Sequence, residues 1–205
     1  MSDDRRRHWD TVYQTKATTS VSWYQPVAEP SLAALDGFRV PHTAGLIDIG
    51  GGASPLVDNL VERGWTDLTV LDIAEPALAI ARQRLAKAGE RVRWICADIT
   101  SWMPDRLYDV WHDRAVLHFL TEAAQRQHYR QALEAALRPG GLAIIATFAL
   151  DGPERCSGLP VRRYDADLLA QELGDGFELL KSWRQSHATP GGANQSFNWC
   201  AFRRR

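Results

Sequence analysis

The chain has 205 residues, of which 45% are hydrophobic and 24% charged. This length and balance suit one buried core, so we expect a single domain over residues 1–205. The formal net charge of −1 provides no basic surplus, which argues against a constitutive nucleic-acid or membrane-surface binder. Cys96, Cys156 and Cys200 are far apart, so we expect no disulfide framework, no metal site and a cytoplasmic protein.

Apolar runs of strand length alternate with amphipathic runs of helix length in the first three quarters of the chain. This order predicts parallel strands joined by crossover helices. Ser54 and Pro55 are expected to start the first of these helices and Gly64 to end it. The expected strands are 46–49, 68–71, 92–99, one beginning at 108, and 142–149; the expected helices are 54–64, 74–89 and 121–141.

The alternation of expected strands and helices changes in the last quarter of the chain. A short helix is expected over 165–174, followed by strands at 177–183 and 195–204. The connection between these strands is too short for a crossover helix, so they should be antiparallel neighbours. The expected fold is α/β: a doubly wound, mostly parallel seven-stranded sheet with an antiparallel C-terminal hairpin.

Three glycines, Gly50, Gly51 and Gly52, follow the first expected strand in the stretch "LIDIGGGAS". In a doubly wound sheet, ligands bind beyond the carboxyl ends of the strands, where this turn lies. Asp48 precedes the glycines, and Asp72 ends the next strand, where a carboxylate would hold a ribose diol. A tight structural turn with a capping aspartate is the alternative. A dinucleotide pyrophosphate fits poorly because Pro55 stands where a further glycine is needed.

Several segments together resemble the class I S-adenosylmethionine-dependent methyltransferases. "LIDIGGGAS" is similar to their first motif, and "LDI" with Asp72 to the segment that binds the ribose hydroxyls. "CADIT" with Asp98 and Ile99 resembles the segment that brackets adenine, and "LRPGG" resembles a late motif. The resemblance spans roughly residues 45–150. It implies a Rossmann-like fold and the cofactor S-adenosyl-L-methionine, with S-adenosyl-L-homocysteine as product.

The same resemblance implies roles for individual residues around the cofactor. Asp48 and the glycine turn would hold its amino-acid portion, Asp72 the ribose diol and Asp98 the adenine amino group. Ile73 and Ile99 would flank the ring, although ordinary core packing explains these isoleucines equally well.

The segment "YDVWHDRAVLHFL" resembles the place where the fourth strand opens into the family's active site. Asp113, Arg114 and His118 would then lie near the transferred methyl group. Asp113 is a candidate base or amine-orienting carboxylate that would also contact the cofactor, and Arg114 a candidate clamp for a substrate carboxylate or phosphate. For Arg114, a structural salt bridge is the alternative. His112 should face the opposite side of the strand from Asp113, as an interior histidine.

Residues 1–44 precede the first strand and contain many aromatic residues. We expect a helical lid here, in which Trp9, Tyr13, Trp23 and Tyr24 cover the cofactor; an aromatic face would attract its sulfonium by ~0.5–2 kcal/mol. Trp23 is the strongest candidate for contact with the cofactor. Alternatively, these aromatic residues fasten an additional helix to the sheet.

Residues 45–150 would form the cofactor-binding core, and residues 151–205 a substrate loop and the C-terminal β-hairpin. The loop holds Cys156, Arg162, Arg163 and Tyr164, which suggests an anionic substrate or, alternatively, a solvated surface loop. No Asn/Asp-Pro-Pro-aromatic motif is present, which argues against methylation of base amines. We expect methyl transfer to a thiol, nitrogen or oxygen of a small molecule. A protein-lysine methyltransferase and a non-catalytic adenosylmethionine-binding protein are the alternatives.

Overall fold

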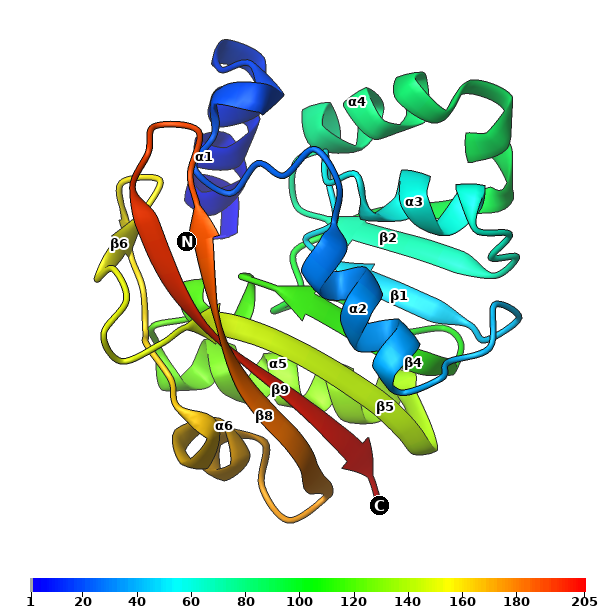
Figure 1. The fold of residues 1–205 in the computed structure, drawn as a ribbon, viewed down its shortest axis with the longest axis vertical. Coiled ribbons are helices and arrows are strands. Elements are labelled where there is room, and N and C mark those ends of the chain that lie inside the picture. The colour runs from blue at the N-terminus through cyan, green and yellow to red at the C-terminus, as the bar shows by residue number, and fades with distance from the viewer. Residues whose placement is uncertain (1) are drawn as a thin grey trace.

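The structure is a computed structural model and describes residues 2–205. Within these residues, the centre is a seven-stranded sheet with strand order β3-β2-β1-β4-β5-β9-β8 (Figure 1). The strands are β1 (Leu46–Ile49), β2 (Leu68–Asp72), β3 (Val92–Cys96), β4 (Tyr108–Arg114), β5 (Leu137–Phe148), β8 (Phe177–Ala188) and β9 (Asn194–Arg204), with a separate small hairpin of β6 (Arg155–Cys156) and β7 (Leu159–Pro160). The α-helices are α1 (Ser2–Thr15), α2 (Glu29–Gly37), α3 (Leu56–Glu62), α4 (Glu75–Leu85), α5 (Ala123–Ala136) and α6 (Ala166–Leu173).

The first five strands of the sheet run parallel, and β9 pairs antiparallel with both β5 and β8. The expected fold class is therefore confirmed. A five-residue connection, 189–193, joins β8 to β9. It is too short to carry the chain back along the sheet, so the two strands form a hairpin.

Helices cover both faces of the sheet, and Figure 1 shows α2 on one side of it and α5 on the other. One core cluster joins Leu46 to residues of α2, α3 and α4, whereas the other joins Ile47 to residues of α5 and α6. Neighbouring residues of β1 thus enter different layers, because side chains alternate along a strand. Burial on both faces explains why β1 and β2 are mostly apolar. No helix within residues 2–205 combines the length and the apolar character needed to cross a membrane.

Some element boundaries differ from the expected ones. β3 ends at Cys96 instead of residue 99, because the carboxylate of Asp98 accepts a hydrogen bond from Thr100 N at 2.9 Å and turns the chain. The helix expected over 74–89 ends at Leu85, where Ala86 has a φ of 48°. Gly64 ends α3 with a φ of 83°, as expected.

Candidate functional site

The chain turns sharply at Gly50–Gly52, between β1 and α3. Gly50 has a φ of 68° and Gly52 a φ of 30°, a region that residues with a side chain rarely adopt. A Cβ atom at Gly50 would overlap Val116, and one at Gly52 would overlap the carboxylate of Asp72. The turn therefore places backbone without side chains beside the ends of β1 and β2, which keeps that space open.

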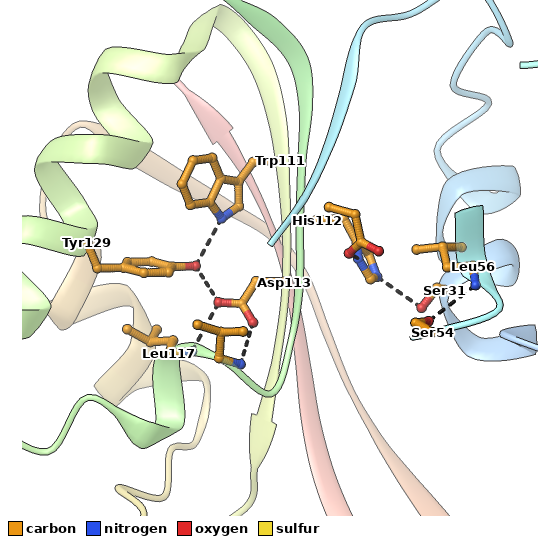
Figure 2. A network of polar contacts seen from close by, with 10 residues as sticks. Ser31, Ser54, Leu56, Trp111, His112, Asp113, Leu117 and Tyr129 are labelled. Atoms are coloured by element: carbon orange, nitrogen blue, oxygen red, sulfur yellow. Dashed lines mark hydrogen bonds and ion pairs between the residues drawn. The ribbon is translucent and has the colours of Figure 1, made fainter. Parts of the chain in front are cut away.

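Asp48 belongs to a buried chain of hydrogen bonds. His112 Nδ1 lies 2.7 Å from Asp48 Oδ1, and His112 Nε2 lies 2.9 Å from Ser31 Oγ. Figure 2 shows His112 directed toward Ser31. Asp48, His112 and Ser31 are 4%, 2% and 1% exposed. The imidazole thus fixes the orientation of the Asp48 carboxylate, and His112 is an interior histidine, as expected.

Asp72 is the last residue of β2, and Asp98 comes just after β3. Both therefore lie at the same edge of the sheet. Asp72 Oδ1 accepts a hydrogen bond from Ala74 N at 2.8 Å, and Asp98 Oδ1 accepts one from Thr100 Oγ1 at 2.7 Å. Burial raises the pKa of Asp72 to about 7, and the nearby charge of Asp48 acts in the same direction. Asp72 therefore changes its charge near neutral pH.

Two adjoining pockets open at this edge. The larger encloses about 870 Å³, including open space at its mouth, and the smaller about 410 Å³. Tyr13, Trp23, Ile49, Gly50 and Arg114 line both pockets. The structure brings together in these walls most of the residues expected to bind a cofactor: Trp23, Asp48, Gly50, Gly51, Asp72, Ile73, Asp98 and Ile99.

Helix α1 forms part of the wall of the larger pocket. Arg5, Trp9 and Tyr13 of this helix line it, whereas Tyr24 does not. The Trp9 ring centroid lies 5.6 Å from that of Trp23, so these rings also pack on one another. Arg5 Nη2 lies 3.3 Å from Asp98 Oδ2. The aromatic residues therefore cover the pocket and hold α1 in place at the same time, as the two sequence-based alternatives separately proposed.

Asp113 points toward α5 and not into either pocket. Its Oδ1 accepts a hydrogen bond from Val116 N at 2.7 Å, and its Oδ2 accepts one from Leu117 N at 3.1 Å and one from the Tyr129 hydroxyl at 2.7 Å. Figure 2 shows Asp113 and His112 directed to opposite sides of β4. The placement of Asp113 thus differs from the expected one beside the cofactor and the transferred methyl group, because the side chain fastens the end of β4 to α5.

His118 also lies outside the pocket walls. It is fully buried, and its Nδ1 accepts a hydrogen bond from Phe148 N at 3.2 Å. Burial lowers the pKa of His118 to about 3, and the charge of Arg114 contributes, so the imidazole is neutral. Its expected place near the methyl group is not the observed one, because it helps to hold the segment after β4 against β5.

Residues 46–141 match a family model described as a methyltransferase domain. Over these residues, the chain is similar to methyltransferase domains. The match begins at β1 and ends within β5, so it contains the glycine turn and Asp48, Asp72 and Asp98.

Known methyltransferases resemble this chain in part of the sequence and in the fold. Nodulation protein S of Rhizobium fredii is 29% identical over 105 residues, which are 51% of this chain and 59% of that protein. A SAM-dependent methyltransferase from Anabaena variabilis superposes with a TM-score of 0.77 at 16% identity, covering 100% of this chain and 95% of the other. The 1,6-didemethyltoxoflavin-N1-methyltransferase of Burkholderia thailandensis, solved with its substrate and S-adenosylhomocysteine, gives 0.70 at 24% identity, covering 99% and 86%.

The loop after β5 contributes less to the pocket walls than expected. Cys156 lines the larger pocket, and burial raises the pKa of its thiol to about 11. Arg163, in contrast, pairs with Glu154 at 3.0 Å, and Arg162 lies over the ring of Tyr164. Neither arginine lines a pocket, because both are held by residues of the surface around α6 and the loop itself.

Several wall residues of the larger pocket were not expected from the sequence. Phe119, Phe148, Gln195 and Phe197 line it, on the side away from Asp72 and Asp98. Phe148 and Phe197 are directly paired across β5 and β9. No motif marks Phe148, Gln195 or Phe197, whereas Phe119 lies within the segment "YDVWHDRAVLHFL". Only the pairing of β9 with β5 brings the start of β9 to the pocket, and strand alternation then places Gln195 on the same face as Phe197.

Proposed function

We propose that this protein binds S-adenosyl-L-methionine and transfers its methyl group to a thiol, nitrogen or oxygen of a small molecule. The observation that carries this proposal is the convergence of a glycine turn and three buried aspartates on two adjoining pockets of a methyltransferase fold. Asp48 and the Gly50–Gly52 turn would hold the amino-acid portion of the cofactor. Asp72 would hold the ribose diol, Asp98 the adenine amino group, and Ile73 and Ile99 would flank the ring.

The walls fit such a cofactor in shape and in chemistry. Cβ atoms at Gly51 and Gly52 would collide with the carboxylates of Asp48 and Asp72, so only glycine leaves these oxygens accessible beside the turn. Hydroxyl and amino groups donate hydrogen bonds, and ionised carboxylates are their strongest acceptors. A pocket of several hundred Å³ is the usual size for a ligand of this kind.

When bound, S-adenosyl-L-methionine supplies a methyl group on a positively charged sulfur, which leaves as a neutral thioether. The protein's contribution is to orient the acceptor and to exclude water. Trp9 and Tyr13 of α1, together with Trp23, line the larger pocket and would cover the bound cofactor. At the other end, the described wall contains no histidine and no glutamate. We therefore assign Asp113 and His118 structural roles, and the acceptor atom must carry a free electron pair, either as the neutral group or because it entered the pocket already deprotonated.

The covered pocket favours a small acceptor over a protein side chain. Aromatic residues from α1 and from the segment before α2 stand over it, and apolar residues form most of the wall. A protein segment would have to displace α1 before a lysine could reach the interior. The toxoflavin-precursor methyltransferase from Burkholderia thailandensis, which shares the fold, was solved with a small heterocycle bound.

Calorimetry with the full chain tests the cofactor, with NAD as the comparison ligand. S-adenosylmethionine and S-adenosylhomocysteine should bind, and NAD should not. If neither adenosyl compound binds, the proposal is wrong.

Incubation of a cell lysate with the protein and methyl-labelled cofactor then tests the acceptor. After separation by size, the label should appear among small molecules. Label among proteins would favour a protein lysine, and label in neither fraction would favour a non-catalytic binder.

A further inference from the structure

Arg114 is an arginine without a carboxylate partner in a largely apolar pocket. Its Nη1 donates a hydrogen bond to Trp23 O at 3.2 Å, and its guanidinium lies 5.1 Å from the centroid of the Phe197 ring. No salt bridge to it is found within residues 2–205. Arg126, the buried arginine on the other side of the sheet, instead has Glu172 at 2.7 Å and two backbone carbonyls.

This isolation is costly unless a ligand compensates for it. A guanidinium has five N–H donors and stays charged, and a buried charge is normally paired. Burial lowers the pKa of Arg114 to about 10, which shows that its surroundings disfavour the charge. The side chain lines both pockets, so its remaining donors are available to a bound molecule.

Gln195 is a second polar group in the same wall without a protein partner. It is 8% exposed, and its Oε1 is buried and has no hydrogen-bond partner in the described part of the chain. Such groups are rare in folded proteins, because leaving one unpaired is unfavourable. Gln195 lines the larger pocket and not the smaller one beside the glycine turn. Its partner should therefore be the acceptor, not the amino-acid portion of the cofactor.

The remaining wall at this end is aromatic and apolar. Phe119, Phe148 and Phe197 line it, with the neutral thiol of Cys156. A flat apolar ring packs well against such faces. One cation and one neutral carboxamide in this setting match a ligand with a single negative charge.

Resting on the proposed function, we infer that the methyl acceptor is a small aromatic carboxylate, whose carboxylate group pairs with Arg114 and whose second polar substituent bonds to Gln195. A planar carboxylate accepts two parallel hydrogen bonds from a guanidinium, which a neutral amide of the same shape does not reproduce. The acid and its primary amide therefore differ in the carboxylate group, which is the feature that Arg114 is proposed to bind.

The test uses the full chain saturated with S-adenosylhomocysteine. Salicylate, thiosalicylate and anthranilate are titrated by calorimetry, each alongside its primary amide. At least one acid should bind about tenfold more tightly than its amide, the difference expected for a charge-assisted hydrogen bond. Arg114→Gln should reduce this acid-to-amide ratio to about one, and Arg114→Lys should restore part of it.

Two further variants separate recognition from a general disturbance of the fold. Gln195→Leu should weaken acid and amide alike, by about three- to tenfold, and leave their ratio unchanged. Arg184→Gln removes an exposed positive charge that pairs with Asp151 outside the pocket, so both affinities should stay as they are.

Some outcomes overturn the inference. If no acid binds the wild-type complex more tightly than its amide, the acceptor is not of this class. If Arg114→Gln weakens binding of S-adenosylhomocysteine and leaves the acid-to-amide ratio unchanged, Arg114 serves the carboxylate of the cofactor instead. Absence of S-adenosylhomocysteine binding would be the separate failure of the proposed function, and the first titration reveals it.

Discussion

The protonation of the Asp72 carboxyl group should affect both the stability of the protein and the binding of its ligand. In the folded protein, burial raises the pKa of this carboxyl group to about 7 from a usual value of 3.8. Because the folded state retains the proton longer than the unfolded chain, this residue's contribution to stability is present below about pH 4 and is lost as the pH rises toward 7. The hydroxyl groups of a ribose need the ionised form of Asp72 as their hydrogen-bond acceptor. The affinity for the ligand should therefore rise as the pH rises, whereas the contribution of Asp72 to stability falls.

The affinity for S-adenosylhomocysteine should therefore rise about tenfold between pH 6 and pH 8, as the ionised fraction of Asp72 rises. Calorimetry at several pH values measures this slope. Asp72→Asn should bind the ligand more weakly at every pH and without the slope. Asp105→Asn, an exposed acid paired with Arg93, serves as the control and should behave like the wild type. If the affinity of Asp72→Asn depended on pH in the same way as that of the wild type, a group other than Asp72 would be responsible for the pH dependence.

Helix α1 lines the larger pocket, and we expect it to control access to that pocket. Arg5 pairs with Asp98, the residue proposed to hold adenine, and also donates to Thr100 Oγ1 at 3.2 Å. His8 of the same helix lies 3.4 Å from Ser157 Oγ, in the turn between β6 and β7. The helix thus contacts both the cofactor end and the substrate loop. A ligand must pass α1 to enter or to leave.

Arg5→Ala should increase both the association and the dissociation rate of S-adenosylhomocysteine by about tenfold, since one charge-assisted hydrogen bond of ~1.4 kcal/mol no longer holds α1 closed. Stopped-flow measurements of tryptophan fluorescence follow both rates, because Trp9 and Trp23 line the pocket. Arg7→Ala is the matched control, since this exposed arginine of the same helix pairs only with Asp4. Equal rates for the two variants would mean that α1 does not limit access.

The whole molecule should unfold as one unit, in keeping with the single domain expected from the chain length. β9 is paired with β5 from Leu142 to Phe148, so the C-terminal hairpin and the cofactor-binding core share one sheet. Trp199 of β9 is 1% exposed, stacks on Trp183 at 5.7 Å and lies 6.3 Å from the ring of His112. The hairpin and the buried chain around Asp48 therefore depend on each other.

Trp199→Ala should lower the free energy of unfolding by about 3–5 kcal/mol, as expected for loss of a fully buried aromatic side chain. Trp183→Ala, on the edge strand β8 and only half-buried, should cost less. Urea titrations monitored by circular dichroism and by binding of S-adenosylhomocysteine should give coincident transitions for each protein. Loss of the hairpin's signal while ligand binding persists would contradict a single cooperative unit.

The sequence by itself determined the order of strands and helices, the antiparallel hairpin and the glycine turn with its three aspartates. These features are local: hydrophobic periodicity, capping residues and a connection length each restrict the chain within a few residues. The expectation placed both Asp113 and Arg114 at the site, although side chains of neighbouring strand residues point in opposite directions. Alternation correctly separated His112 from Asp113, but it does not say which side chains of β4 reach a pocket.

Only the tertiary structure decided that question. The pockets lie at the carboxyl edge of the sheet, where Arg114 lines both of them, whereas the side chain of Asp113 is turned to α5. The acceptor end was likewise beyond the sequence, because Gln195 and Phe197 arrive there through pairing with a strand about fifty residues earlier in the chain. Contacts between segments so distant in sequence arise from packing of the whole sheet, which no local pattern encodes.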